Sequence, residues 1–163
     1  MALDATVGGA NADSYIDVAT FDALALTRSN VPEGSSTAEK ETALKAATSR
    51  LEQERYRGDV NSTSQRLKWP RAGVFDDDGN EYSTGAIPRP LQEATADLAI
   101  ALLTDPAYLD RSGLAQFEEL SVGPIALTPR ATALLPGDLP SSVKRWLRNL
   151  RATFSGQAQI VRG

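Results

Sequence analysis

The stretch RLKWPRAGVFDDDGNEYSTGAIPRPL, residues 66–91, decides the fold because it separates two segments with helical periodicity. Trp69 precedes a proline, which favours an extended backbone at the tryptophan. Asp78-Gly79 is a strong signal for a tight turn. No long periodicity runs through residues 58–86. The sequence therefore predicts a loop-rich insertion at about 58–86, flanked by helices.

Two helices are predicted on the N-terminal side of this insertion. Apolar residues recur at helical spacing between residues 17 and 28. Ser36 followed by Glu39 forms a capping-box pattern, which predicts the start of a second helix that runs to about Tyr56.

The C-terminal side completes a mainly α fold. Residues 87–103 begin with prolines that suit the first turn of a helix, and their apolar residues on several sides are typical of a central helix or a subunit interface. Two short strands are expected at about 115–128, as a β-hairpin. A basic C-terminal helix and arm is expected over 139–163. We predict one domain over residues 1–163, a small bundle of three to four helices with the loop-rich insertion and the hairpin.

The composition narrows the possible chemistry. The 163 residues include no cysteine and no histidine, which excludes thiol nucleophiles, Ser-His-Asp triads and nearly every zinc or copper site. No apolar run approaches the ~20 residues that span a bilayer, and the N-terminus lacks the features of a signal peptide. We therefore expect no enzymatic activity, no cofactor and no membrane partner, and a protein that stays in the compartment where it is made.

The acidic run that starts at Asp76 resembles a calcium-binding loop only in part. Asp78 and Asn80 match positions 3 and 5 of an EF-hand loop. However, Glu81 stands at position 6 where glycine is required, and Ile87 stands at position 12 where glutamate is required. The pattern favours a solvated acidic turn, and we predict no metal site.

Positive charge is concentrated at the C-terminal end of the chain. The net charge is −4, but after Asp138 there is no acidic residue, so the first 138 residues carry 12 positive and 21 negative side chains. Such asymmetry indicates an arm that binds a negative surface or nucleic acid. The expected helix has an apolar inner stripe and a basic outer stripe, and its candidate interface residues are Lys144, Arg145, Arg148 and Arg151. Because Lys144, Arg148 and Arg151 have no acidic partner in that helix, we expect them to find negative charge on another subunit or on DNA.

A second candidate interface lies at Trp69, Pro70 and Arg71. Trp69 could be a platform on which bases stack, with Lys68 and Arg71 contacting phosphates. A lone tryptophan between Leu67 and Pro70 more often fills a core or a protein interface, so packing is the favoured interpretation.

Several motifs resemble a known phage family. They are NADSYIDVATFDAL at residues 11–24, WPRAGVFDDDG at 69–79, IPRPLQEATADLAIALL at 87–103 and VGPI at 122–125. In this order they resemble the head–tail connector, or adaptor, proteins of tailed bacteriophages, a group also described as DnaT-like single-stranded-DNA-binding proteins. The resemblance covers roughly residues 10–128 and does not include the C-terminal helix.

The resemblance implies a structural protein of the virion, located at the neck, where head and tail join. Before assembly, such a protein would be in the host cytoplasm. Such a subunit would assemble with itself as a ring, commonly a dodecamer, beneath the portal protein. The ring would continue the channel for double-stranded DNA without sequence-specific binding and would dock tail or head-completion proteins.

The alternative is a single-stranded nucleic-acid-binding replication accessory protein, as the DnaT-like description states. That function needs a basic groove interleaved with aromatic side chains. The chain has ten aromatic residues, an acidic body and one basic helix, which favours the connector at the level of sequence.

Overall fold

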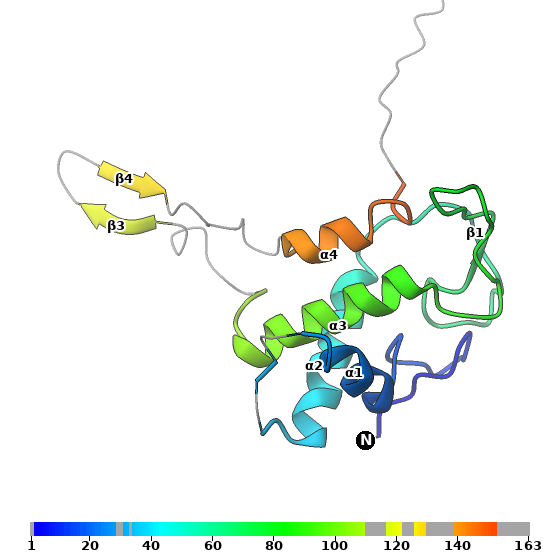
Figure 1. The fold of residues 1–163 in the computed structure, drawn as a ribbon, viewed down its shortest axis with the longest axis horizontal. Coiled ribbons are helices and arrows are strands. Elements are labelled where there is room, and N and C mark those ends of the chain that lie inside the picture. Colours follow the sequence, from blue (N-terminus) through cyan, green and yellow to red (C-terminus); the bar gives the residue numbers. More distant parts are fainter. Residues whose placement is uncertain are drawn as a thin grey trace, which may run out of the picture.

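The computed structural model describes residues 2–28, 31–32, 34–109, 117–121, 126–129 and 139–152. Four helices lie within these ranges, in agreement with the predicted three to four, and Figure 1 shows their arrangement. They are α1 (Val18–Ala25), α2 (Thr37–Leu51), α3 (Arg89–Thr104) and α4 (Ser141–Trp146).

Local signals in the sequence explain where the helices begin. The side chain of Asp17 accepts a hydrogen bond from the backbone N–H of Thr20 and so caps α1. Ser36 and Glu39 form the predicted capping box of α2, each side chain accepting from the backbone of the other. Pro88 is the N-cap residue of α3, where a missing N–H does no harm.

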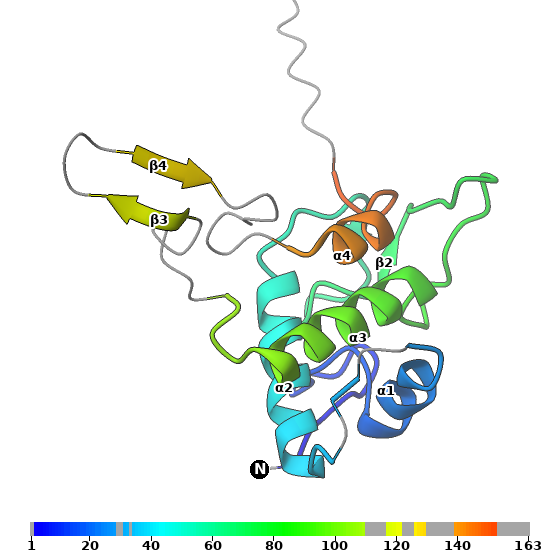
Figure 2. The same ribbon diagram turned by 60° about the vertical axis from the view of Figure 1, so that its left-hand side comes forward.

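Helix α3 is the centre of the core. It contacts the other three helices, with α4 on one side and α1 and α2 on the other (Figures 1 and 2). Nine of its sixteen residues are buried, as expected for a helix with apolar residues on several sides. The largest fully buried side chains of the core come from all four helices and the insertion, and include Phe21, Leu44, Leu51, Trp69, Leu91, Leu98, Ile100 and Leu147.

The insertion at 58–86 is irregular, as predicted, but strand pairing fixes its first half. Strand β1 (Asp59–Val60) pairs antiparallel with β2 (Arg71–Ala72), and each strand has only two residues. Gly58 has a φ of 68°, and a Cβ there would collide with the carbonyl oxygen of Ala72, so this turn requires glycine. Trp69, which follows a long turn and precedes a cis proline, is 1% exposed.

The predicted hairpin is present in the backbone. Strand β3 (Phe117–Ser121) pairs antiparallel with β4 (Ala126–Pro129), with a register shift between Phe117 and Glu119. The expected range of about 115–128 is confirmed to within a few residues. The turn at Gly123-Pro124 lies outside the described residues.

The C-terminal helix is shorter than the sequence predicts. Helix α4 ends at Trp146, and the chain then turns until Arg151 forms a β-bridge with Tyr56. The reason is tertiary pairing, because the backbone N–H of Arg57 donates to Leu150 and that of Ala152 donates to Arg55. The rest of the expected arm, 153–163, lies outside the described residues. Within the described ranges, none of the helices has the length and hydropathy needed to cross a bilayer.

Candidate nucleic-acid interface

Three segments that are distant in sequence meet beside the C-terminal end of α4. Residues 55–57 pair with residues 150–152 through the backbone bonds described above. Arg71 joins the third segment to them, because its guanidinium donates to the carbonyl oxygens of Arg57, Gly58 and Lys68. This side chain therefore fixes the start of the insertion against its middle.

Arginines from all three segments gather at this junction. Arg55 and Arg57 flank Tyr56, and since Tyr56 is buried while both arginines are exposed, the extended chain directs the two guanidiniums outward. Arg148 and Arg151 follow α4. We call this set the arginine face; its members are Arg55, Arg57, Arg71, Arg148 and Arg151.

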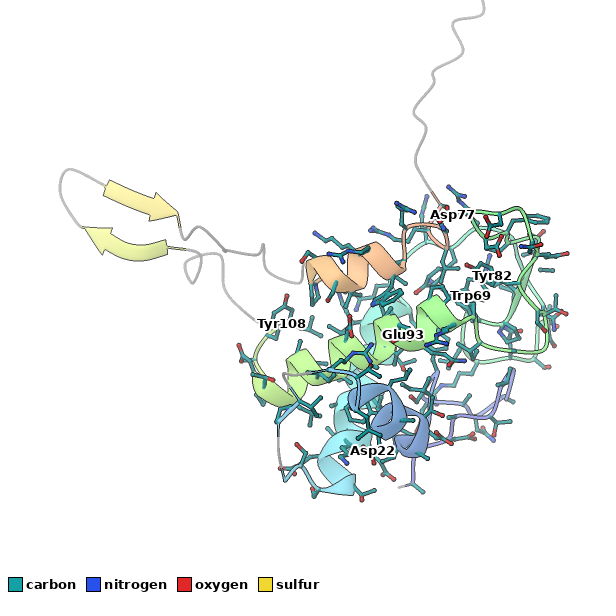
Figure 3. All side chains as sticks on the ribbon, viewed as in Figure 1. Asp22, Trp69, Asp77, Tyr82, Glu93 and Tyr108 are labelled. Atoms are coloured by element: carbon teal, nitrogen blue, oxygen red, sulfur yellow. The ribbon has the colours of Figure 1, made fainter. Side chains whose placement is uncertain are left out.

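The arginine face also contacts two carboxylates of its own chain. Arg151 Nη2 lies 2.7 Å from Oε2 of Glu54, and Arg148 Nη2 lies 3.1 Å from Oδ2 of Asp77. Figure 3 shows Asp77 in the insertion, close to the end of α4. The fold thus brings acidic residues from distant segments to Arg148 and Arg151, which have no acidic partner within their own helix. That these arginines also bind negative charge on another molecule stays a prediction.

The two ion pairs differ in burial. The side chain of Glu54 is 10% exposed, so the Glu54–Arg151 pair is a fixed part of the fold. Arg148 and Asp77 have side chains that are 72% and 67% exposed, and pairs of that kind contribute only about 0–1 kcal/mol. Arg148 can therefore exchange Asp77 for another anion at little cost.

The other predicted interface residues have different positions. Trp69 and Pro70 are buried, and the indole of Trp69 meets the ring of Tyr56 edge to face, so neither side chain offers a surface to a base. Lys144 and Arg145 are exposed on α4. Arg145 lines a pocket beside Trp146 rather than the arginine face.

Sequence reasoning missed Arg55 and Arg57. The available signal was the alternation in Glu54-Arg55-Tyr56-Arg57, which is typical of an extended segment with one buried aromatic. This signal was assigned to the end of the preceding helix, which in fact ends at Leu51.

The insertion is attached to the end of α2 by a half-buried acidic residue, Glu52. Glu52 accepts hydrogen bonds from the hydroxyl of Tyr15 and from the backbone N–H of Lys68, the latter at 3.0 and 3.1 Å. Burial, followed by the nearby charges, raises the pKa of Tyr15 far above its ordinary value, so this hydroxyl stays protonated as the donor. These hydrogen bonds hold Lys68, and with it the adjacent Trp69, against the end of α2.

The acidic turn is satisfied by its own backbone. One carboxylate oxygen of Asp76 accepts from the N–H groups of Asp78 and Asn80, at 2.9 and 2.8 Å. Hydrogen bonds from Asn80 hold the pKa of Asp76 below its ordinary value. The structure assembles no group of three or more metal-ligating side chains within the ranges it describes.

Comparisons with known proteins identify a family. A family model described as "Putative DnaT-like ssDNA binding protein" matches residues 1–163. No curated protein and no solved structure matches the chain. The match spans the whole sequence, so the chain belongs to the DnaT-like family that carries this description.

Proposed function

We propose that this protein is a non-enzymatic DNA-binding protein that uses the arginine face to contact phosphates. The observation that carries the proposal is the convergence of five guanidiniums from three segments in a chain whose net charge is −4. Arginine forms charge-assisted, often bidentate hydrogen bonds with phosphate oxygens. The family description supports single-stranded DNA as the ligand.

The chemistry of the arginine face favours contact with the backbone of DNA over contact with bases. Trp69 and Tyr56, the aromatic residues next to these arginines in sequence, are both buried. Neither ring is accessible to a base. Phosphate contacts position a strand but carry no sequence information. We therefore expect binding that depends strongly on salt and weakly on sequence.

A triple substitution tests the proposal. Arg55, Arg57 and Arg148 are exposed, so changing all three to Gln should preserve the fold. Fluorescence anisotropy with a labelled (dT)20 oligonucleotide should show a loss of affinity of about tenfold or more, because charged contacts contribute most of non-specific DNA binding.

A matched control separates the arginine face from overall charge. Lys40 and Lys45 lie on α2 and Arg89 lies on α3, and they pair with Asp22, Asp13 and Glu93. Changing these three to Gln removes the same charge elsewhere and should weaken binding by less than about twofold, by the same reasoning. Equal losses in the two triple variants would contradict a defined site.

The second candidate function is the phage head–tail connector. It is favoured by the order of the motifs at 11–24, 69–79 and 87–103 and by the burial of the Trp-Pro pair inside the second of them. In this role the protein would form a ring at the neck of the virion, between the portal protein and tail or head-completion proteins. The arginine face would then meet double-stranded DNA or a neighbouring acidic body.

Two measurements separate the candidates. A single-strand-binding protein should bind (dT)20 more tightly than a duplex of equal length and should be absent from purified particles. A connector should be found at the neck in cryo-electron micrographs of virions, as a ring, and should show no preference for single strands. Finding the protein in neither particles nor DNA complexes would contradict both candidates.

A further inference from the structure

A second site lies on the other side of α4. A pocket of about 510 Å³ opens between α4, α3 and the end of α1. Its lining combines hydroxyl, charged, aliphatic and aromatic side chains: Thr27, Arg28, Glu93, Asp97, Ile100, Ser142, Arg145 and Trp146. The pocket therefore offers hydrogen-bonding and charged groups beside an aromatic ring.

The indole of Trp146 is held in a fixed orientation at this pocket. Its Nε1 donates to Oδ2 of Asp97 at 3.0 Å, and Asp97 is in turn held by Arg28, whose Nε lies 2.5 Å from Oδ1. The residue nevertheless remains 39% exposed. An aromatic ring that is anchored at one edge and still open to solvent is suited to stacking, because little freedom is lost when a flat ligand binds.

The pocket lining carries two positive and two negative side chains. Glu93 and Asp97 both contact Arg28, at 2.6 and 2.5 Å, which neutralises part of their charge at the base of the pocket. Arg145 is exposed and adds a second positive charge beside Trp146. The pocket therefore does not repel an anionic ligand whose negative group lies near Arg145.

We propose that this pocket accepts one base of single-stranded DNA, stacked on Trp146, with a flanking phosphate at Arg145. The site rests on the proposed DNA-binding function and adds the element that the arginine face lacks, an exposed aromatic platform. Stacking on an aromatic side chain tolerates every base and requires an unpaired strand. The pocket thus accounts for a preference for single strands, while the arginine face supplies phosphate contacts.

Tryptophan fluorescence tests the site directly. The chain has two tryptophans, and Trp69 is only 1% exposed, so quenching by unlabelled (dT)20 reports on Trp146. We expect strong quenching in the wild type and in the variant Trp69→Phe, and none in Trp146→Phe. Trp146→Ala should weaken binding about tenfold to a hundredfold, the range produced by losing one base stack, and Trp146→Phe should restore most of the affinity.

Phe75 provides a matched control, because it is a 50% exposed aromatic side chain outside the pocket. Phe75→Ala should change the affinity by less than about twofold, because Phe75 does not line the pocket in which the base would stack. Tight binding of (dT)20 without quenching of Trp146 would overturn the stacking site while the arginine face stands. Absence of binding by the wild type would overturn the proposed function and this site together.

Discussion

The rings of Tyr56 and Trp69 meet edge to face, with centroids 5.7 Å apart and an angle of 78° between their planes. Tyr56 precedes the insertion and Trp69 lies within it, so this contact closes the first half of the insertion against the core. The hydroxyl of Tyr56 also donates to the carbonyl of Leu51, at the end of α2. The aromatic pair therefore supports the position of Arg55 and Arg57 on the surface.

The first prediction concerns Trp69. Trp69→Ala removes a fully buried indole and should lower the free energy of unfolding by about 3–5 kcal/mol. Trp146→Ala is the matched control, and we expect a loss of less than about 1 kcal/mol because its side chain is partly exposed. Urea denaturation followed by circular dichroism measures both. Similar losses for the two variants would contradict the assignment of Trp69 to the core.

The second prediction compares two arginines that share one partner. Arg28 and Arg89 both contact Glu93, but their side chains are 13% and 82% exposed. Arg28→Met leaves Glu93 and Asp97 without their buried counter-charge and should cost about 3–5 kcal/mol. Arg89→Met should cost less than about 1 kcal/mol. Thermal and urea unfolding of the two variants measure these losses of stability. Equal losses for Arg28→Met and Arg89→Met would contradict the dependence on burial.

The third prediction concerns pH and the cap of α1. The hydrogen bond from Thr20 lowers the pKa of Asp17, so the cap stabilises the fold above the unfolded-state pKa and is lost as the pH falls through the folded-state pKa. Asp17→Ala should cost about 1 kcal/mol at pH 7, and the gap to wild type should shrink below about pH 4. Asparagine also caps a helix but does not titrate, so Asp17→Asn should remain more stable than Asp17→Ala at pH 7 and at pH 3. If wild type and Asp17→Ala differ in the free energy of unfolding by the same amount at pH 3 as at pH 7, the charge of Asp17 does not contribute to the cap.

The fourth prediction concerns salt. If all five members of the arginine face contact phosphates of a single strand, the logarithm of the binding constant should fall with the logarithm of salt concentration with a slope of about −3.5. Arg57→Gln should reduce the magnitude of that slope by about 0.7 and weaken binding to all sequences alike. Anisotropy titrations at several salt concentrations measure the slope. A slope near zero would exclude phosphate contact as the main source of affinity.

Those parts of the fold that depend on local chemistry could be predicted from the sequence. The capping box at Ser36 and Glu39 and the prolines before α3 are signals within one turn of backbone, and the structure confirms both. The burial of Trp69 followed from its neighbours Leu67 and Pro70. The short hairpin could also be predicted from the sequence, because its two strands are adjacent in the chain.

The candidate sites depend on contacts that periodicity does not encode. The spacing of apolar residues continued past Trp146, but pairing of 150–152 with 55–57 ended the helix early. The same pairing brought Arg151 to Glu54, which is 97 positions away in the sequence. Trp146 is one of the apolar residues of the expected C-terminal helix, yet its indole donates to Asp97 and stays partly exposed. The end of α4, the Arg151–Glu54 pair and the orientation of Trp146 all depend on tertiary contacts, which a single sequence does not show.

The last prediction uses the ion pair between Arg148 and Asp77. In free protein the carboxylate of Asp77 lies 3.1 Å from Arg148, so a phosphate that binds Arg148 must displace it. Asp77→Asn removes this competitor and should strengthen the binding of (dT)20 by about two- to fivefold, the equivalent of an exposed ion pair.

Asp78→Asn is the control for this change. It removes the same charge from the next position of the acidic turn, and Asp78 is also exposed. General repulsion between the turn and DNA would make the two variants equally strong binders, whereas competition for Arg148 predicts a larger gain for Asp77→Asn. The gain should also disappear when Arg148 is changed to Gln, because the released guanidinium is then absent. Anisotropy at low salt, where electrostatic contacts are least screened, gives the clearest comparison.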